Sequence, residues 1–301
     1  MIKKIKKALL CLVLCTCITA CKETEATIVE DYNKNLGELI LDSNEVKREF
    51  DLKLTSVDNQ TDGLFATNDT NGNRTTYFFR GKVDNNYIVF ADLKWRIVRI
   101  NEDGTIKLIM ENGITSNTGY NFNENTEDYN KMYYKNSLAE STLNKWYENT
   151  LKDYDDNIVE GNFCTDFKVV SSYFEQINGI STTLYQNYTP TLRCNNVLKS
   201  KIGLLTIDEV SYAGAFYRMP NETYYLNNNQ FFWTMSPAGF EKKYADTYEW
   251  IIGKTGELNI YDVSDGENYK VVLRPVINLK KDTIAISGNG TFNAPYRIKT
   301  N

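Results

Sequence analysis

The side chains that could do chemistry in this chain of 301 residues are carboxylates and cysteines, because the sequence contains no histidine. Without histidine, the Ser-His-Asp and Cys-His nucleophile arrangements and nearly all zinc sites of the usual type are excluded. A glycan hydrolase could still use two carboxylates about 5 to 9 Å apart, one of them with a raised pKa. Glu249, Asp262 and Asp265 are candidates for such a pair, although no spacing singles them out.

The amino terminus has the pattern of an export signal. Residues 1–7 are basic, and residues 8–18 form an apolar run that suits secretion but is too short to span a bilayer. The run ends in Ile18-Thr19-Ala20-Cys21, which resembles the lipobox of bacterial lipoproteins. This resemblance implies cleavage before Cys21 and its modification with acyl chains such as palmitate, which would anchor the protein durably at the outer face of the cell membrane. The alternative is an ordinary signal peptide followed by an incidental cysteine.

Two further cysteines, Cys164 and Cys194, remain after the signal segment and Cys21 are set aside. An even pair in an exported chain predicts one disulfide bond. A redox-active pair is the alternative, but the chain has no Cys-x-x-Cys spacing to favour it.

The charge of the chain limits its partners. Removing residues 1–20 takes away four lysines and no acids, so the formal charge of -5 becomes -9 in the mature chain. This charge argues against nucleic acid as a partner and against a polybasic membrane patch. We expect the lipid anchor to provide the contact with the membrane, and an extracellular glycan or protein to be the ligand.

We expect no cofactor and no metal. Asp69, Asn71 and Asn73 alternate as ligands do in calcium loops, but the glycine and the distal glutamate of an EF-hand are not at the required positions. A turn is the better interpretation of this segment.

The remaining pattern predicts an acidic tether followed by one α+β domain, with boundaries at 21–59 and 60–301. Residues 95–110 form a predicted hairpin, whose second strand should place Lys107 and Ile109 on a face that is at least half exposed to water. Ser137 and Glu140 form a capping box that starts a helix reaching about Leu151, and Thr206 and Glu209 form a second one.

Short predicted strands and loops make up the second half of the chain. They include 230–235, 248–252, 258–263 and 269–273, with a hairpin turn at 253–256. Trp233 and Trp250 lie in this half and are the candidate ligand-binding residues, because aromatic rings offer large contact area at small entropic cost.

Several motifs together resemble an uncharacterised family of exported lipoproteins from low-GC Gram-positive bacteria, over about residues 75–297. They are Tyr77-Phe-Phe-Arg-Gly81, Asn86-Tyr-Ile-Val-Phe90, Trp95-Arg-Ile-Val-Arg-Ile100, Phe163-Cys-Thr-Asp166, Trp233-Thr-Met-Ser-Pro237 and Arg274-Pro-Val-Ile-Asn-Leu279. More distantly, the closing pattern is similar to the C-type-lectin-like domains of formylglycine-generating enzymes and bacterial surface receptors. The resemblance implies a C-type-lectin-like fold with antiparallel sheets and two short helices.

The chain also departs from these relatives. It lacks the Glu-Pro-Asn, Gln-Pro-Asp and Trp-Asn-Asp triplets of calcium-dependent lectins, and it has no counterpart of the paired catalytic cysteines of the formylglycine enzymes. We therefore expect a non-catalytic module for binding or adhesion, with a carboxylate-dependent glycan hydrolase as the alternative. A solute receptor of a transporter is disfavoured because the βα alternation of two doubly wound lobes is missing.

Overall fold

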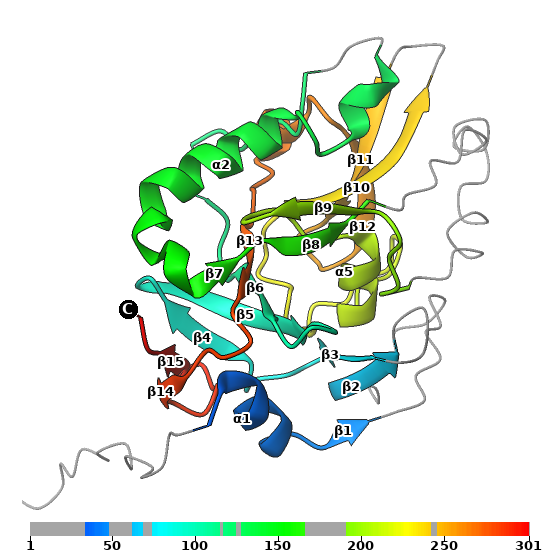
Figure 1. Ribbon diagram of the computed structural model, residues 1–301. Helices are drawn as coiled ribbons and strands as arrows, with labels where there is room; N and C mark the ends of the chain where they lie inside the picture. Colours follow the sequence, from blue (N-terminus) through cyan, green and yellow to red (C-terminus); the bar gives the residue numbers. More distant parts are fainter. Residues whose placement is uncertain are drawn as a thin grey trace, which may run out of the picture. The chain divides into compact units, whose positions relative to one another are not determined.

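The computed structural model describes residues 34–47, 62–68, 74–114, 117–124, 128–165, 191–241 and 246–300 (Figure 1). The chain divides into two compact units, Met1–Asp31 and Tyr32–Asn301, and every described residue belongs to the second. Cys21, the predicted turn at 69–73 and most of the segment between Cys164 and Cys194 lie outside the described residues. Within the described ranges, none of the helices has the length and apolar composition needed to cross a bilayer.

The fold is mixed α+β and consists mostly of sheet. Its described helices are α1 (Leu36–Asp42), α2 (Leu138–Thr150), α5 (Ile207–Ala213) and α6 (Gly266–Tyr269), with the 3-10 helices η1 (Tyr129–Met132) and η2 (Lys152–Asn157). The main sheet contains β1 (Val46–Lys47), β2 (Gly63–Asn68), β3 (Thr75–Arg80), β4 (Tyr87–Phe90), β5 (Leu93–Ile100), β6 (Ile106–Met110), β7 (Ile158–Val159), β13 (Val276–Leu279), β14 (Ala285–Ser287) and β15 (Tyr296–Ile298). Two smaller sheets contain β8 (Gly161–Cys164) with β9 (Val197–Ser200), and β10 (Phe232–Glu241) with β11 (Asp246–Ile252) and β12 (Leu258–Asp262).

Strand β5 is the centre of the main sheet. It pairs with β6 along one edge, and with β4 and then β3 along the other. Trp95, the third residue of β5, is fully buried, and its indole N–H donates to the carbonyl of Phe90 at 3.1 Å. The hairpin predicted at 95–110 is therefore confirmed as β5 and β6.

One prediction about this hairpin is wrong. All five residues of β6 are buried, including Lys107 and Ile109, which were expected on a partly wet face. Lys107 is only 1% exposed because Glu209, on α5, lies against its ammonium group. Alternation within a strand cannot reveal that an element distant in the sequence covers the second face.

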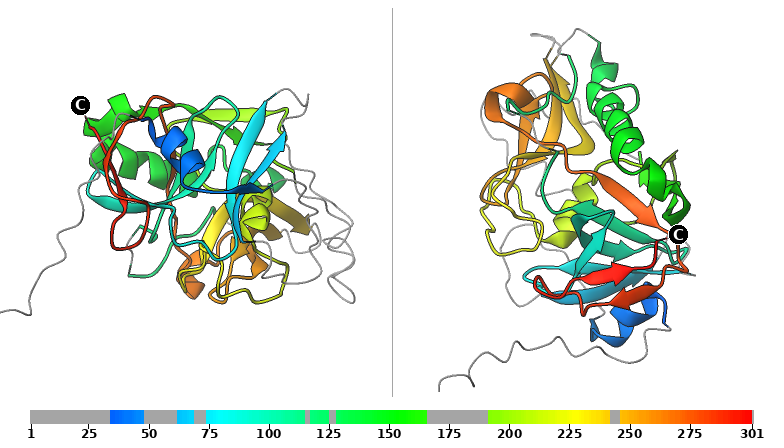
Figure 2. Two further views of the ribbon diagram at one scale, coloured as in Figure 1. Left: turned by 90° about the horizontal axis from the view of Figure 1, so that it is seen from below. Right: turned by 90° about the vertical axis from the view of Figure 1, so that its left-hand side faces the viewer.

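The segment predicted as a tether contains two elements that belong to the folded unit. Strand β1 runs parallel to β2, and the backbone N–H of Leu36 donates to the carbonyl of Thr283 at 2.7 Å. Both views of Figure 2 place α1 beside the last two strands, β14 and β15, in agreement with this bond.

The two predicted helix starts are present. Ser137 accepts from the backbone N–H of Glu140 at 3.0 Å, while the Glu140 carboxylate accepts from the Asn136 N–H instead of closing the box on Ser137. The Thr206 and Glu209 box is complete.

The predictions for the last strands have mixed outcomes. Strands β10, β11 and β12 and the turn at 253–256 are confirmed. The strand predicted at 269–273 is wrong, because Tyr269 ends α6 and Lys270 takes a left-handed backbone conformation.

Candidate functional site

The predicted disulfide bond between Cys164 and Cys194 is present in the structure. Cys164 ends β8, and Cys194 lies three residues before β9 begins. A pocket of about 320 Å³ lies beside the disulfide, in the size range of small-ligand sites. Its wall combines the ends of β8 and β9, the start of α5 and the β5–β6 hairpin.

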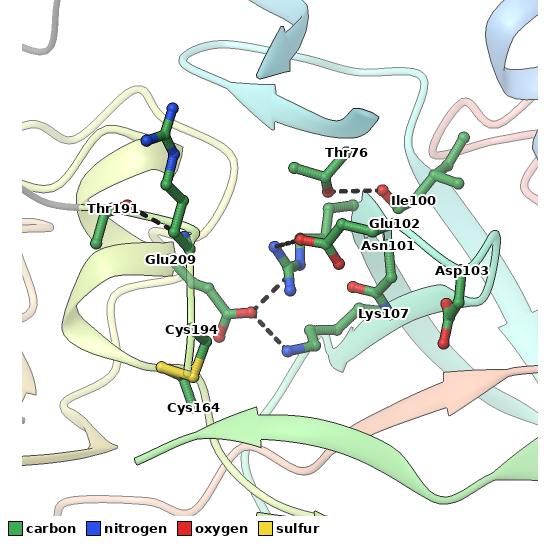
Figure 3. A network of polar contacts seen from close by, with 12 residues as sticks. Thr76, Ile100, Asn101, Glu102, Asp103, Lys107, Cys164, Thr191, Cys194 and Glu209 are labelled. Carbon is green, nitrogen blue, oxygen red and sulfur yellow. Dashed lines mark hydrogen bonds and ion pairs between the residues drawn. A yellow bond between two sulfur atoms is a disulfide. The ribbon is translucent and has the colours of Figure 1, made fainter. Parts of the chain in front are cut away.

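A buried ionic network forms the floor of this pocket. The Lys107 ammonium donates to Glu209 Oε1 at 2.6 Å, and Arg99 Nε lies 3.5 Å from the same oxygen. Arg99 Nη1 lies 3.8 Å from a carboxylate oxygen of Glu102. Figure 3 shows Lys107 and Glu209 pointing toward each other from the hairpin and from α5, with the disulfide nearby. The network therefore joins two elements that are far apart in the sequence.

A bulge in the hairpin brings the two cations together. Ile97 pairs with Leu108, but the register shifts after Ile97 so that Arg99 comes to lie opposite Lys107. Cross-strand partners share a face, and like charges in such a pair are unfavourable. Glu209 contacts both cations and Glu102 adds a second negative charge near Arg99, while the Glu209 carboxylate is also held by the N–H of Thr206 in the capping box.

The pKa values follow from this geometry. Burial lowers the pKa of Lys107, while the nearby Glu209 carboxylate opposes that change. Burial alone would raise the pKa of Glu209, but the charges of Lys107 and Arg99 and the hydrogen bonds to the carboxylate outweigh it, so the pKa is lowered. Glu209 is therefore ionised at neutral pH and holds its place as the counter-ion.

Arg99 is incompletely satisfied by its protein partners. Its side chain is buried, and neither Nε nor Nη1 has a partner within hydrogen-bonding geometry, since both contacts with carboxylates are longer than ordinary hydrogen bonds. These two nitrogens are covered, but the Arg99 side chain lines the pocket, so its charge attracts an acidic group bound there. Among the described residues, the pocket wall contains four cations and two carboxylates, a formal charge of +2, formed by Arg74, Arg99, Lys107 and Arg193 against Glu102 and Glu209.

The segment at the mouth of the pocket is held by three separate contacts. The disulfide fixes Cys194, the backbone N–H of Thr191 donates to Asp208 at 2.6 Å, and the buried Leu192 packs with Phe65 and Phe78. These contacts hold the chain on both sides of Arg193, which is exposed and lines the pocket.

The structure places both predicted ligand-binding tryptophans in the core. Trp233 is 1% exposed and donates its indole N–H to the carbonyl of Tyr120 at 2.7 Å. Trp250 is 8% exposed and packs edge-to-face on Tyr217 at 5.6 Å. Neither residue lines the pocket beside the disulfide, so the candidate site lies elsewhere.

The structure does not bring the three candidate catalytic carboxylates together in one site. Glu249 pairs across the sheet with Tyr261, and Asp262 pairs with Tyr248, so Glu249 and Asp262 point to opposite faces. Asp265 precedes α6 and accepts from the Asn268 amide. Among the described residues, no group of three or more acids and thiols is arranged as metal ligands would be.

Comparisons with protein-family models, curated proteins and solved structures found no match. The role of this site is therefore argued from its geometry alone. Sequence reasoning missed Arg99 and Lys107 as site residues and treated Glu209 only as a helix cap. The sequence did contain an indication of this site. Lys107 interrupts an otherwise apolar strand, and a buried cation requires a counter-ion elsewhere in the chain.

Proposed function

We propose that this protein is a lipid-anchored surface module that binds an extracellular glycan or protein without changing it chemically. We further propose that the ligand inserts an acidic group into the pocket beside the disulfide. The observation that carries this proposal is the buried, incompletely satisfied Arg99 at the floor of a pocket of charge +2, in a chain whose own charge is -5.

The acidic group is expected to be a carboxylate, sulfate or phosphate. A guanidinium presents a planar set of donors that matches such groups, and a partly buried cation interacts with them more strongly than one in water. Arg74 and Arg193 at the pocket wall would add attraction as the ligand approaches.

The mixed α+β architecture, with short strands and few helices, is compatible with the C-type-lectin-like fold that the sequence motifs suggest. That fold remains part of the proposal. Glu249 and Asp262 point to opposite faces of their sheet and therefore do not face each other as a hydrolytic pair, whereas Asp265 lies close to Asp262 in the chain, and its backbone N–H donates to the Asp262 carbonyl at 3.1 Å.

The first test is binding of the exported protein to an array of acidic and neutral glycans and matrix proteins. We expect Arg99→Gln to weaken binding of the acidic ligand by about 10- to 100-fold, because a hydrogen bond to a charged group contributes about 1.5 to 3 kcal/mol. Arg99→Lys keeps the charge but loses the planar donors, and should recover only part of the affinity.

Arg193→Gln at the exposed mouth tests the same pocket without disturbing its floor, and should weaken binding by a smaller factor. Arg218→Gln is the matched control, because Arg218 is exposed and does not line the pocket. Recovery of the ligand intact after long incubation is expected. Equal affinity of the wild type and both pocket variants would refute the proposed site, and cleavage of the ligand would refute a non-catalytic role.

The anchor makes a separate prediction. Replacing Cys21 by alanine should release the protein from the membrane fraction into the medium, because each buried CH₂ of the acyl chains contributes about 0.8 kcal/mol to membrane binding. Fractionation of cells that express Cys21→Ala or wild-type protein measures this. Retention of the variant in the membrane would exclude lipidation at Cys21 as the anchor.

A further inference from the structure

Two exposed apolar side chains lie in a hairpin at one edge of the main sheet. Phe292 is 56% exposed and Ile286 is 53% exposed, more than any other large hydrophobic side chain in the described part of the protein. Both belong to the hairpin formed by β14, β15 and the loop between them, residues 285–298, called here the β14–β15 hairpin. Burying such side chains against another surface is favourable.

The loop holds Phe292 in its exposed position. Gly288 and Gly290 have φ values of 91° and 81°, and the carbonyl of Gly290 accepts from the Tyr87 N–H at 2.7 Å. The Phe292 ring packs edge-to-face on Tyr87 at 5.4 Å, and the Lys94 ammonium lies 3.5 Å from the ring centroid. These contacts fix the ring while leaving more than half of the side chain uncovered.

The stretch of chain that contains this hairpin is basic, unlike the chain as a whole. Residues 280–300 contain four cations and one carboxylate, a formal charge of +3, formed by Lys280, Lys281, Arg297 and Lys299 against Asp282. Arg297 and Ile286 are exposed, whereas their neighbours Ile298 and Ala285 point into the core. Apolar groups surrounded by cations fit an anionic lipid surface.

The chain approaches the folded unit at this same edge. Asn35 forms an isolated bridge with Ile284, immediately before β14, and Leu36 is bonded to Thr283. Lys34 follows Cys21 by 13 positions, a span of at most about 45 Å when fully extended. An anchor at Cys21 would therefore hold this edge within reach of the membrane.

We propose that the β14–β15 hairpin rests on the headgroup layer of the membrane, with Phe292 and Ile286 inserted at its surface and the neighbouring cations on anionic headgroups. This inference depends on the proposed lipid anchor at Cys21. In Figure 1, β14 and β15 lie at the lower left, whereas α5, β8 and β9 around the candidate pocket lie toward the right. Contact through the hairpin would thus leave the pocket open to a ligand outside the cell.

Tryptophan fluorescence tests this contact. The lipidated full-length mature protein carrying Phe292→Trp is reconstituted into vesicles of phosphatidylglycerol and phosphatidylcholine whose acyl chains are brominated. We expect the added indole to shift its emission to shorter wavelength and to be quenched, relative to the wild type measured in the same vesicles. Tyr269→Trp is the matched control, because Tyr269 is 48% exposed at the end of α6 and should be neither shifted nor quenched.

A second set of variants tests the charge. Adding Arg297→Glu and Lys299→Glu to Phe292→Trp should reduce the quenching, and so should replacing phosphatidylglycerol with phosphatidylcholine. Unchanged melting temperatures of the variants would show that they are folded. Tight binding of the hairpin to a soluble phosphate polymer, without quenching in vesicles, would identify a different polyanion as its partner and overturn the membrane proposal.

Flotation of the vesicles separates the two proposals. Protein that floats with the vesicles while the added indole behaves like that of the Tyr269 control would overturn the hairpin contact and leave the anchor intact. Failure of the lipidated wild type to float would overturn both, because the hairpin contact rests on the anchor. Flotation with selective quenching at position 292 supports both.

Discussion

Replacing Glu209 by glutamine is expected to lower the free energy of unfolding by about 4 kcal/mol, because removing one partner of a buried ion pair leaves the other charge uncompensated. Glu209 is 5% exposed and is the counter-ion of Lys107 and Arg99, which lie opposite each other on β5 and β6. Without the carboxylate, two buried cations would repel each other. Denaturant unfolding followed by circular dichroism measures the change.

Glu140→Gln is the matched control for this prediction. Glu140 occupies the same third position of a helix, α2, and accepts from a backbone N–H, but it is only partly buried and has no ion pair among the described contacts. We expect its substitution to cost less than about 1 kcal/mol. Adding Lys107→Met to Glu209→Gln should restore part of the lost stability. If Glu209→Gln destabilises no more than Glu140→Gln, the network is not what holds α5 to the hairpin.

Replacing Glu249 by leucine is expected to have the opposite effect and to stabilise the protein by about 3 kcal/mol at neutral pH. Glu249 is fully buried, and neither of its carboxyl oxygens has a hydrogen-bond partner. Leaving such a group unsatisfied is costly, and an apolar side chain of similar size avoids that cost. Thermal and denaturant unfolding of the two proteins measure the difference.

The pH dependence of stability gives a second readout of Glu249. Burial raises its pKa well above the ordinary value of 4.5, so the folded protein keeps a proton that the unfolded chain releases. As the pH rises above about 4.5, the unfolded chain therefore binds fewer protons, and stability falls until the folded-state pKa is passed. The free energy of unfolding of the wild type should therefore fall as the pH rises above about 4.5, whereas that of Glu249→Leu should show no such fall.

Glu148→Leu is the control for both measurements. Glu148 is exposed and forms a surface ion pair with Lys152, so its replacement should change stability by less than about 0.5 kcal/mol. Glu209 gives stability the opposite pH dependence. Its pKa is lowered in the folded protein, so the stability that it contributes is lost as the pH falls below 4.5. Parallel pH profiles of the wild type and Glu249→Leu would contradict a carboxyl group that is protonated in the folded state.

Local patterns in the sequence were sufficient for much of the secondary structure. Alternating apolar residues around an Asp-Gly turn predicted β5 and β6, and the spacing of Thr206 and Glu209 predicted the start of α5. The parity of the cysteines predicted the bond between Cys164 and Cys194. Each of these features depends on neighbours in the chain or on covalent chemistry, so it can be inferred without knowledge of tertiary contacts.

The candidate site depended instead on contacts between distant segments. Lys107 and Glu209 are 102 positions apart in the chain. Arg99 lies beside them because of a β-bulge that no sequence pattern predicted. The buried Trp233 likewise donates its indole N–H to the carbonyl of Tyr120 and packs near Phe122, both far away in the chain. The sequence by itself determined the β5–β6 hairpin, strands β10 to β12, the starts of α2 and α5 and the disulfide bond, because each depends on local pattern or covalent chemistry. Only the tertiary structure decided which side chains lose contact with water and which charges meet, because both depend on the packing of elements against one another.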